Sequence, residues 1–195
     1  NTVKERLEDW LTYESGEKAF LFYYNSEWST LIGYPAGHGQ DVNINDHHFH
    51  WGYFIHAASF LQQFDPEWVE KWGPMINFLI RDAASTDRSD TKFPFLRNFS
   101  PYAGHSWANG FASFPAGNDQ ESTSESMQFN SSLIHWGTIT GQDEIRDLVG
   151  IENYVHQQPS TKRIPNHFRK VDMLHNSPCY IFEQNFKACD GRFIP

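Results

Sequence analysis

Residues 45–60 read NDHHFHWGYFIHAASF, and we predict that they form a helix running from about Asp46 to Gln63. Three histidines lie within four positions beside Asp46, and aromatic residues fill most of the remainder. Asp46 is also a residue type that caps helix N-termini. The stretch is therefore open to three interpretations: a metal site, a crowded part of the core, or a surface that grips a substrate.

The neighbouring segments also favour helices. Asp65-Pro66 supplies an N-cap and a first-turn proline, and the helix that follows is expected to be interrupted at Gly73-Pro74. Further helices are expected from about residue 2, from about residues 117–119 to 140, and from about residue 143 to 148. Residues 21–37 are expected to form a loop with at most a short strand, and residues 85–118 a long connection. The sequence thus predicts a mainly α protein.

The composition limits the class of partner. Hydrophobic residues make up 39% and aromatic residues 16% of the chain, with seven Trp and seventeen Phe. Such rings can fill a core, and they also provide stacking platforms for sugars and bases. The net charge of -9 argues against nucleic acid, because phosphates are bound by an excess of Lys and Arg. A neutral polysaccharide stays compatible, and no apolar run is long enough to cross a membrane.

The character of the chain changes after Leu148. Residues 149–195 hold six basic and four acidic residues and four prolines, with weak periodicity. We therefore divide the chain into a helical region at 1–148, to which the candidate catalytic residues discussed below belong, and an extension of unclear structure at 149–195. Cys179 and Cys189 lie in the extension, and the sequence leaves open whether they are bonded or free.

The histidine cluster does not have the spacing of a zinc site. Zinc-binding helices often place two histidines four residues apart, so that both rings converge on one face. Here the spacings between His47, His48 and His50 are one, two and three. Because these spacings scatter the rings around a helix, we expect no metal. Hydrogen-bonded structural roles are the alternative for His47 and His48.

A second group of acids lies in GNDQESTSESMQ at residues 117–128. Glu121 and Glu125 are four apart, so both carboxylates should project from one face of a helix near its N-terminus. A solvated helix face would also tolerate this pair. If the site is functional, the helix dipole favours ionised Glu121 as a general base. Asp46, among aromatic residues, could be kept protonated by desolvation and act as a general acid.

Three blocks, in this order, carry a family resemblance: NDHHFHWGYFIHAA, RNFSPYAGHSWANG and GNDQESTSESMQ. They closely resemble signature blocks of glycoside hydrolase family 81, the endo-β-1,3-glucanases or laminarinases. The resemblance runs from about Thr2 to Leu148 and implies an (α/α)6 barrel with a long cleft. A complete barrel needs more helices than this stretch supplies, so the expected fold is an incomplete barrel.

The resemblance also implies roles for individual residues. Asp46 matches the general acid, Glu121 the general base that activates water, and Glu125 a second glutamate that supports it. An inverting reaction of this kind places the two carboxyl groups roughly 6.5–9.5 Å apart. Positions matching substrate contacts are His50, Tyr53, Tyr102, His105, Trp107, Asn118 and Gln120.

The function expected from these features is inverting endo-hydrolysis of β-1,3-glucan without a cofactor. One alternative is a non-catalytic glucan-binding fragment, and another is a zinc hydrolase built on the histidines. The only expected partner is the polysaccharide, although an incomplete barrel would expose apolar helix faces and favour self-association. The opening NTVKERLEDW is not a signal peptide. An extracellular or cell-wall location is expected from the resemblance alone.

Overall fold

The computed structural model describes residues 2–100, 105–110 and 120–148, and this part of the chain is mainly helical, as predicted. Cys179, Cys189 and the rest of the extension lie outside the described residues. The elements follow in the order α1 (Thr2–Leu11), β1 (Leu21–Asn25), β2 (Thr30–Tyr34), α2 (His47–Gln62), α3 (Pro66–Ala84), β3 (Phe99–Ser100), β4 (His105–Ser106) and α4 (Thr123–Thr140). Residues 143–148 are also helical. None of the helices in these ranges combines the length and low polarity needed to cross a bilayer.

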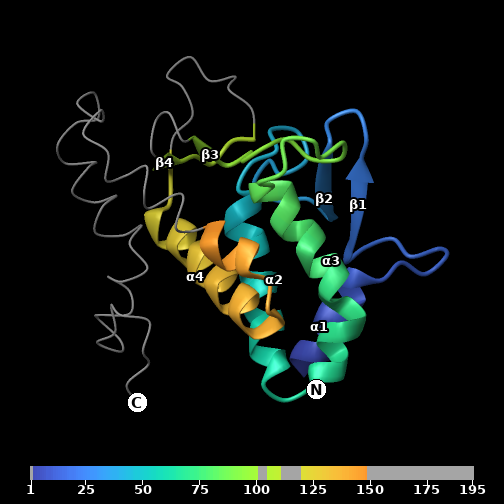
Figure 1. The fold of residues 1–195 in the computed structure, drawn as a ribbon. Coiled ribbons are helices and arrows are strands. Elements are labelled where there is room, and N and C mark those ends of the chain that lie inside the picture. Colours follow the sequence, from blue (N-terminus) through green and yellow to red (C-terminus); the bar gives the residue numbers. More distant parts are fainter. Residues whose placement is uncertain (1, 101–104, 111–119, 149–195) are drawn as a thin grey trace.

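Helix α2 lies at the centre of the fold and contacts both α3 and α4 (Figure 1). The helix formed by the histidine-rich block thus agrees with the predicted range to within a residue at each end. The side chains buried most completely come from all three helices and include Ile55, Ile76, Leu79, Leu133 and Trp136. This shared core fixes α2 relative to the two helices that flank it.

Helices α2 and α4 approach each other closely at Gly52. A Cβ atom added at Gly52 would lie 3.1 Å from the Cα atom of Phe129, which is tighter than an ordinary contact. Glycine therefore allows the two backbones to pack directly against each other. This contact places the beginning of α2 beside the beginning of α4.

The expected interruption at Gly73-Pro74 is wrong, because α3 continues through both residues. Pro74 has no N–H group to donate to the Glu70 carbonyl, and both residues are exposed, so water can replace the missing donor. Gly73 faces the indole ring of Trp136 on α4. Packing on one side and solvation on the other keep the helix intact.

Residues 21–34 form a β-hairpin, where the sequence predicted a loop with at most a short strand. β1 and β2 pair antiparallel, with Phe22 opposite Gly33. The turn is held by the Asn25 side chain, whose Oδ1 accepts from the backbone N–H groups of Glu27 and Trp28 at 3.0 and 3.1 Å. The Phe22 ring packs edge-on against Trp51 of α2 at 5.1 Å. The hairpin therefore covers one side of the central helix.

Candidate active site

Asp46 occupies the N-cap position of α2 but does not cap the helix with its side chain. Its backbone is left-handed, with φ 61° and ψ 16°, whereas capping residues are normally extended. Its N–H group donates to the carbonyl of Ala108 at 2.9 Å, and its own carbonyl accepts from the N–H group of His50 at 2.9 Å. The carboxyl group therefore does not cap the helix, which was the structural role open to Asp46 from the sequence.

The loop that carries Asp46 is held by its main chain. The N–H group of Gly110 points to the Asn43 carbonyl at 3.4 Å. A Cβ atom at Gly110 would lie 2.4 Å from the side chain of Ile44, so only glycine fits there. The two backbone segments thus meet directly beside Asp46.

The environment of Asp46 favours the protonated acid. The residue is 7% exposed, and its Oδ1 atom has no hydrogen-bond partner among the described residues. The pKa of Asp46 is raised to about 6, mainly by burial and also by the charges of Glu121 and Glu125, while those of His38 and His47 oppose the rise. The two glutamates therefore lie within electrostatic reach of Asp46. Such a group can donate a proton in mildly acidic solution.

The expectation that Glu121 and Glu125 share one helix face is wrong. Helix α4 begins at Thr123, and Glu121 lies outside it in a left-handed conformation with φ 49°. Ser122 is the reason: its backbone is extended and its hydroxyl group accepts from the N–H group of Glu125, so it caps the helix. Glu121 is exposed and still lies at the N-terminal end of α4, where the helix dipole favours a negative charge.

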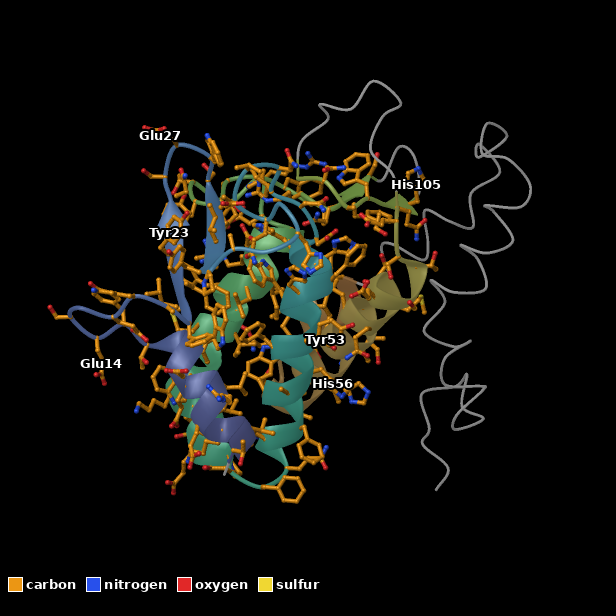
Figure 2. All side chains as sticks on the ribbon, turned by 180° about the vertical axis from the view of Figure 1, so that it is seen from behind. Glu14, Tyr23, Glu27, Tyr53, His56 and His105 are labelled. Carbon is orange, nitrogen blue, oxygen red and sulfur yellow. The ribbon has the colours of Figure 1, made fainter. Side chains whose placement is uncertain are left out.

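Glu125 is connected to α2. It lies three residues after the cap, and its carboxylate accepts a 3.1 Å hydrogen bond from the Tyr53 hydroxyl group. Burial and this hydrogen bond raise the pKa of Tyr53, so the phenol keeps its proton and donates. Figure 2 shows Tyr53 and His56 along the same side of α2, turned away from the hairpin. Asp46, Tyr53 and Glu125 thus come together where α2 meets α4.

The three neighbouring histidines have three different environments. His47 is buried, with Nδ1 2.6 Å from Asp82 and Nε2 2.9 Å from the Gln40 carbonyl. His48 is buried with Nε2 3.2 Å from the Ser126 hydroxyl group, and burial lowers its pKa to about 3. His50 is half-buried and packs edge-on against the His38 ring at 5.5 Å. Within the described ranges, no group of three or more His, Cys, Asp or Glu side chains is placed to hold a metal ion.

The other predicted contact residues are placed in part. His105 and Trp107 lie on and just after β4, with ring centroids 6.4 Å apart. The indole N–H of Trp107 donates to the Arg97 carbonyl at 2.8 Å, which fixes the ring. The Gln120 side-chain nitrogen is buried and has no partner among the described residues. Tyr102 and Asn118 lie outside the described residues.

Two residues near Asp46 were missed from the sequence. His38 contacts His50 and acts electrostatically on Asp46, and its position between two glycines was a weak signal. Asp82 lies fully buried on α3 behind His47. Its signal was an acid at a helical position that is otherwise apolar, which indicates a paired buried charge.

A sequence profile of the glycosyl hydrolase family 81 C-terminal domain matches residues 1–165. The chain belongs to glycoside hydrolase family 81. This confirms the resemblance drawn from the three sequence blocks, and it connects the acidic site at the α2–α4 junction with a family of glycosidases.

Relatives within family 81 are similar over most of this chain. A glucan endo-1,3-β-D-glucosidase of Acetivibrio thermocellus is 55% identical over 148 residues, which cover 75% of this chain and 19% of the relative. A glucan endo-1,3-β-D-glucosidase of Thermobifida fusca is 47% identical over 163 residues, which cover 83% of this chain and 21% of the relative. The structure of a mutant family 81 glycoside hydrolase from Clostridium thermocellum matches with a TM-score of 0.76 and 46% identity, covering 95% of this chain and 24% of that one. The chain thus spans about a fifth of the length of the curated relatives it matches.

Proposed function

We propose that this chain carries the acid and base of an inverting endo-β-1,3-glucanase, with Asp46 as general acid, Glu121 as general base and Glu125 supporting the base. The proposal rests on family membership, since curated relatives are named glucan endo-1,3-β-D-glucosidases. It also rests on the different environments of the two carboxyl groups at the α2–α4 junction. Enzymes that hydrolyse glycosides by this route need one protonated and one ionised carboxyl group.

The observation that carries the proposal is the state of Asp46. Its carboxyl group is buried, has an Oδ1 atom without a partner among the described residues, and has a pKa raised to about 6. A carboxyl group with only a structural role would be hydrogen-bonded within the protein. An unbonded acid beside two glutamates is instead suited to protonate a departing glycosidic oxygen.

Glu121 is suited to the opposite task. It is exposed at the N-terminal end of α4, where water can reach it and where negative charge is favoured. In the proposed reaction it removes a proton from water, which attacks the anomeric carbon on the face opposite the leaving oxygen. The water requires a gap of roughly 6.5–9.5 Å between the Asp46 and Glu121 carboxyl groups, whereas about 5 Å would indicate retention.

The proposed sugar contacts surround these carboxyl groups. His50 and Tyr53 follow Asp46 on α2, one and two turns along the helix. His105 and Trp107 supply an imidazole and a fixed indole ring, and Gln120 supplies an amide nitrogen without a partner among the described residues. Tyr102 and Asn118 stay proposals by resemblance. Aromatic faces with a few polar groups are the usual chemistry of a sugar site.

A non-catalytic glucan-binding fragment is the second candidate. The chain spans about a fifth of its relatives' length, so the activity of the whole relatives is a proposal for this chain. Incubation with laminarin, with reducing ends and bound protein both measured, separates the candidates. Release of oligosaccharides whose new ends first appear as the α-anomer by NMR supports the inverting hydrolase. Binding without release supports the glucan-binding fragment. The absence of both binding and release contradicts both candidates.

The incomplete (α/α)6 barrel and its consequences are proposed on the same basis. Phe60 and Phe64 at the end of α2 are exposed, with ring centroids 5.1 Å apart. Exposed apolar helix faces favour association, so we propose that copies of this chain self-associate. Light scattering over a concentration series tests this, and a monomer at all concentrations contradicts it. An extracellular or cell-wall location is part of the proposal and rests on the family resemblance alone.

A further inference from the structure

Asp82 is a fully buried acceptor behind the candidate acid. Its Oδ2 atom accepts from His47 Nδ1 at 2.6 Å and from the indole N–H of Trp51 at 2.7 Å. Its Oδ1 atom accepts from the Thr30 hydroxyl group at 2.9 Å and the Leu31 N–H group at 3.0 Å. The guanidinium group of Arg97 lies 3.4 Å away. A buried carboxylate with this many donors is ionised, and the pKa of Asp82 is lowered by His47 and Arg97 against the opposing effect of burial.

His47 connects Asp82 to Asp46, because its ring contacts the Asp82 carboxylate and Asp46 is the residue before it in the chain. One ring nitrogen faces the Asp82 carboxylate and the other faces the Gln40 carbonyl at 2.9 Å. Because both partners can only accept, a His47 ring that donates to both carries a positive charge. His48, the next residue, is different: one of its nitrogens has no partner among the described residues, and the other contacts a hydroxyl group.

With His47 protonated, the buried group formed by Asp82, His47 and Arg97 carries one net positive charge behind Asp46. Asp82 then contributes one negative charge, and His47 and Arg97 contribute one positive charge each. His47 also holds the loop that precedes α2 through the Gln40 carbonyl. The Gln40 side chain in turn accepts from the Gly33 N–H group of the hairpin at 3.0 Å. The loop that leads to Asp46 is thus tied to the core through His47.

We propose that Asp82 acts through His47 as a positioning residue for Asp46, holding a fixed positive charge and the preceding loop behind the acid. The inference rests on the proposed function, since it assigns Asp46 a proton to donate. The charge acts against the burial and the two glutamates that favour the protonated acid. Asp82 therefore prevents Asp46 from holding its proton too tightly to transfer it.

Other charged groups face Asp46 and must be separated from this effect. Glu121 and Glu125 act on it from the start of α4, and His38 acts from the preceding loop. His50 lies one turn later on α2, and burial and the charges of His38 and His47 lower its pKa. Around His47 itself lie Asp82, Arg97, His48 and His50. Of the groups that act on Asp46, His47 is the one in contact with Asp82.

The test replaces His47→Gln and follows the Asp46 carboxyl carbon by NMR during a pH titration. Loss of the positive charge should move the Asp46 midpoint upward by about half a pH unit or more. The matched control is His48→Gln, which replaces a buried neighbour of the same size. Burial holds the pKa of His48 near 3, so His48 carries no charge when Asp46 titrates and the control should leave the midpoint unchanged.

A second measurement uses the unaltered protein and does not depend on whether a variant folds. Nitrogen NMR should find both ring nitrogens of His47 protonated while Asp46 titrates, and His48 neutral. A neutral His47, or a His47→Gln variant that folds but leaves the Asp46 midpoint unmoved, overturns the proposal. A purely structural Asp82–His47 pair would lower stability without moving the midpoint. Neither measurement needs turnover, so a chain that fails to cleave glucan contradicts the proposed function alone.

Discussion

The Tyr53 hydroxyl group on α2 donates a 3.1 Å hydrogen bond to the Glu125 carboxylate at the start of α4. Tyr53 is 52% exposed, so its ring contributes little to the core. The bond instead orients a glutamate beside the candidate base, and it spans the same helix pair that brings Asp46 near both glutamates.

Tyr53→Phe should therefore lower glucan cleavage about 5- to 10-fold with little change in melting temperature, because an exposed hydrogen bond of this kind contributes about 1–1.5 kcal/mol. Initial rates on laminarin and a thermal melt measure the two quantities. Tyr23→Phe is the matched control, since Tyr23 is an exposed tyrosine of the hairpin (Figure 2). Equal rates for the two variants would show that Glu125 needs no such support.

Glu121→Gln should reduce cleavage about 10²- to 10⁴-fold, the contribution of a general base, while glucan binding stays close to that of the parent. The amide has the size of the carboxylate but cannot accept the water proton. Turnover and binding are measured on the same preparation. Glu27→Gln, at the tip of the hairpin, is the control (Figure 2). A Glu121→Gln variant with near-parental turnover would mean that the base is misassigned.

Asp46→Asn should abolish cleavage of substrates whose leaving group needs a proton and have a milder effect where it does not. Asn tolerates the left-handed backbone at this position, so the variant should fold. Rates on laminarin are compared with rates on an aryl glucoside oligomer with an acidic phenol. Equal losses on both substrates would count against Asp46 as the acid.

The raised pKa of Asp46 makes stability depend on pH. The folded protein binds this proton more tightly than the unfolded chain does, with a pKa of about 6 against 3.8. The contribution to stability is therefore complete below about pH 4 and is lost as the pH rises through about 6. Asp46→Asn cannot ionise, so its stability relative to the parent should increase by roughly 1–3 kcal/mol between about pH 4 and pH 8. Denaturant melts at the two pH values measure this, and a constant difference would show an unperturbed Asp46.

Gly52→Ala should destabilise the fold by about 1–2 kcal/mol, although alanine is normally the better helix former. The new Cβ atom would lie 3.1 Å from the Phe129 Cα atom, and α4 would have to shift. Cleavage should fall as well, since the shift separates Tyr53 from Glu125. Gly37→Ala, with nothing within 4 Å of its added Cβ atom, is the control. A Gly52→Ala variant as stable as the control would show that the helices can move apart freely.

The helices could be predicted because their signals are local. The range of α2 and the capped start of α3 after Asp65 follow from patterns within a few residues. The continuity of α3 through Pro74 could not be predicted, because it depends on a partner helix on one face and water on the other. The hairpin was missed for a similar reason, since Phe22 is held by rings of α1 and α2 that lie elsewhere in the chain.

The sequence anticipated the environment of Asp46 but not the geometry around Glu121. The raised pKa of Asp46 was expected from burial, and the structure agrees. The sequence predicted that Glu121 lies inside a helix. This is wrong, because Ser122 is the N-cap residue and Glu121 precedes it. Asp82 could not be assigned, because the sequence does not reveal that a residue 36 positions from Asp46 lies behind it.

The position of Asp46 depends on main-chain contacts. Its N–H group donates to the Ala108 carbonyl, and Gly110 lies directly against Ile44. Contacts of this kind do not depend on which side chains the loop presents to solvent. A library that varies exposed positions such as Val42 should therefore change the surface of the loop without displacing Asp46, provided that position 110 is left as glycine. This separation makes the loop a practical starting point for redesign.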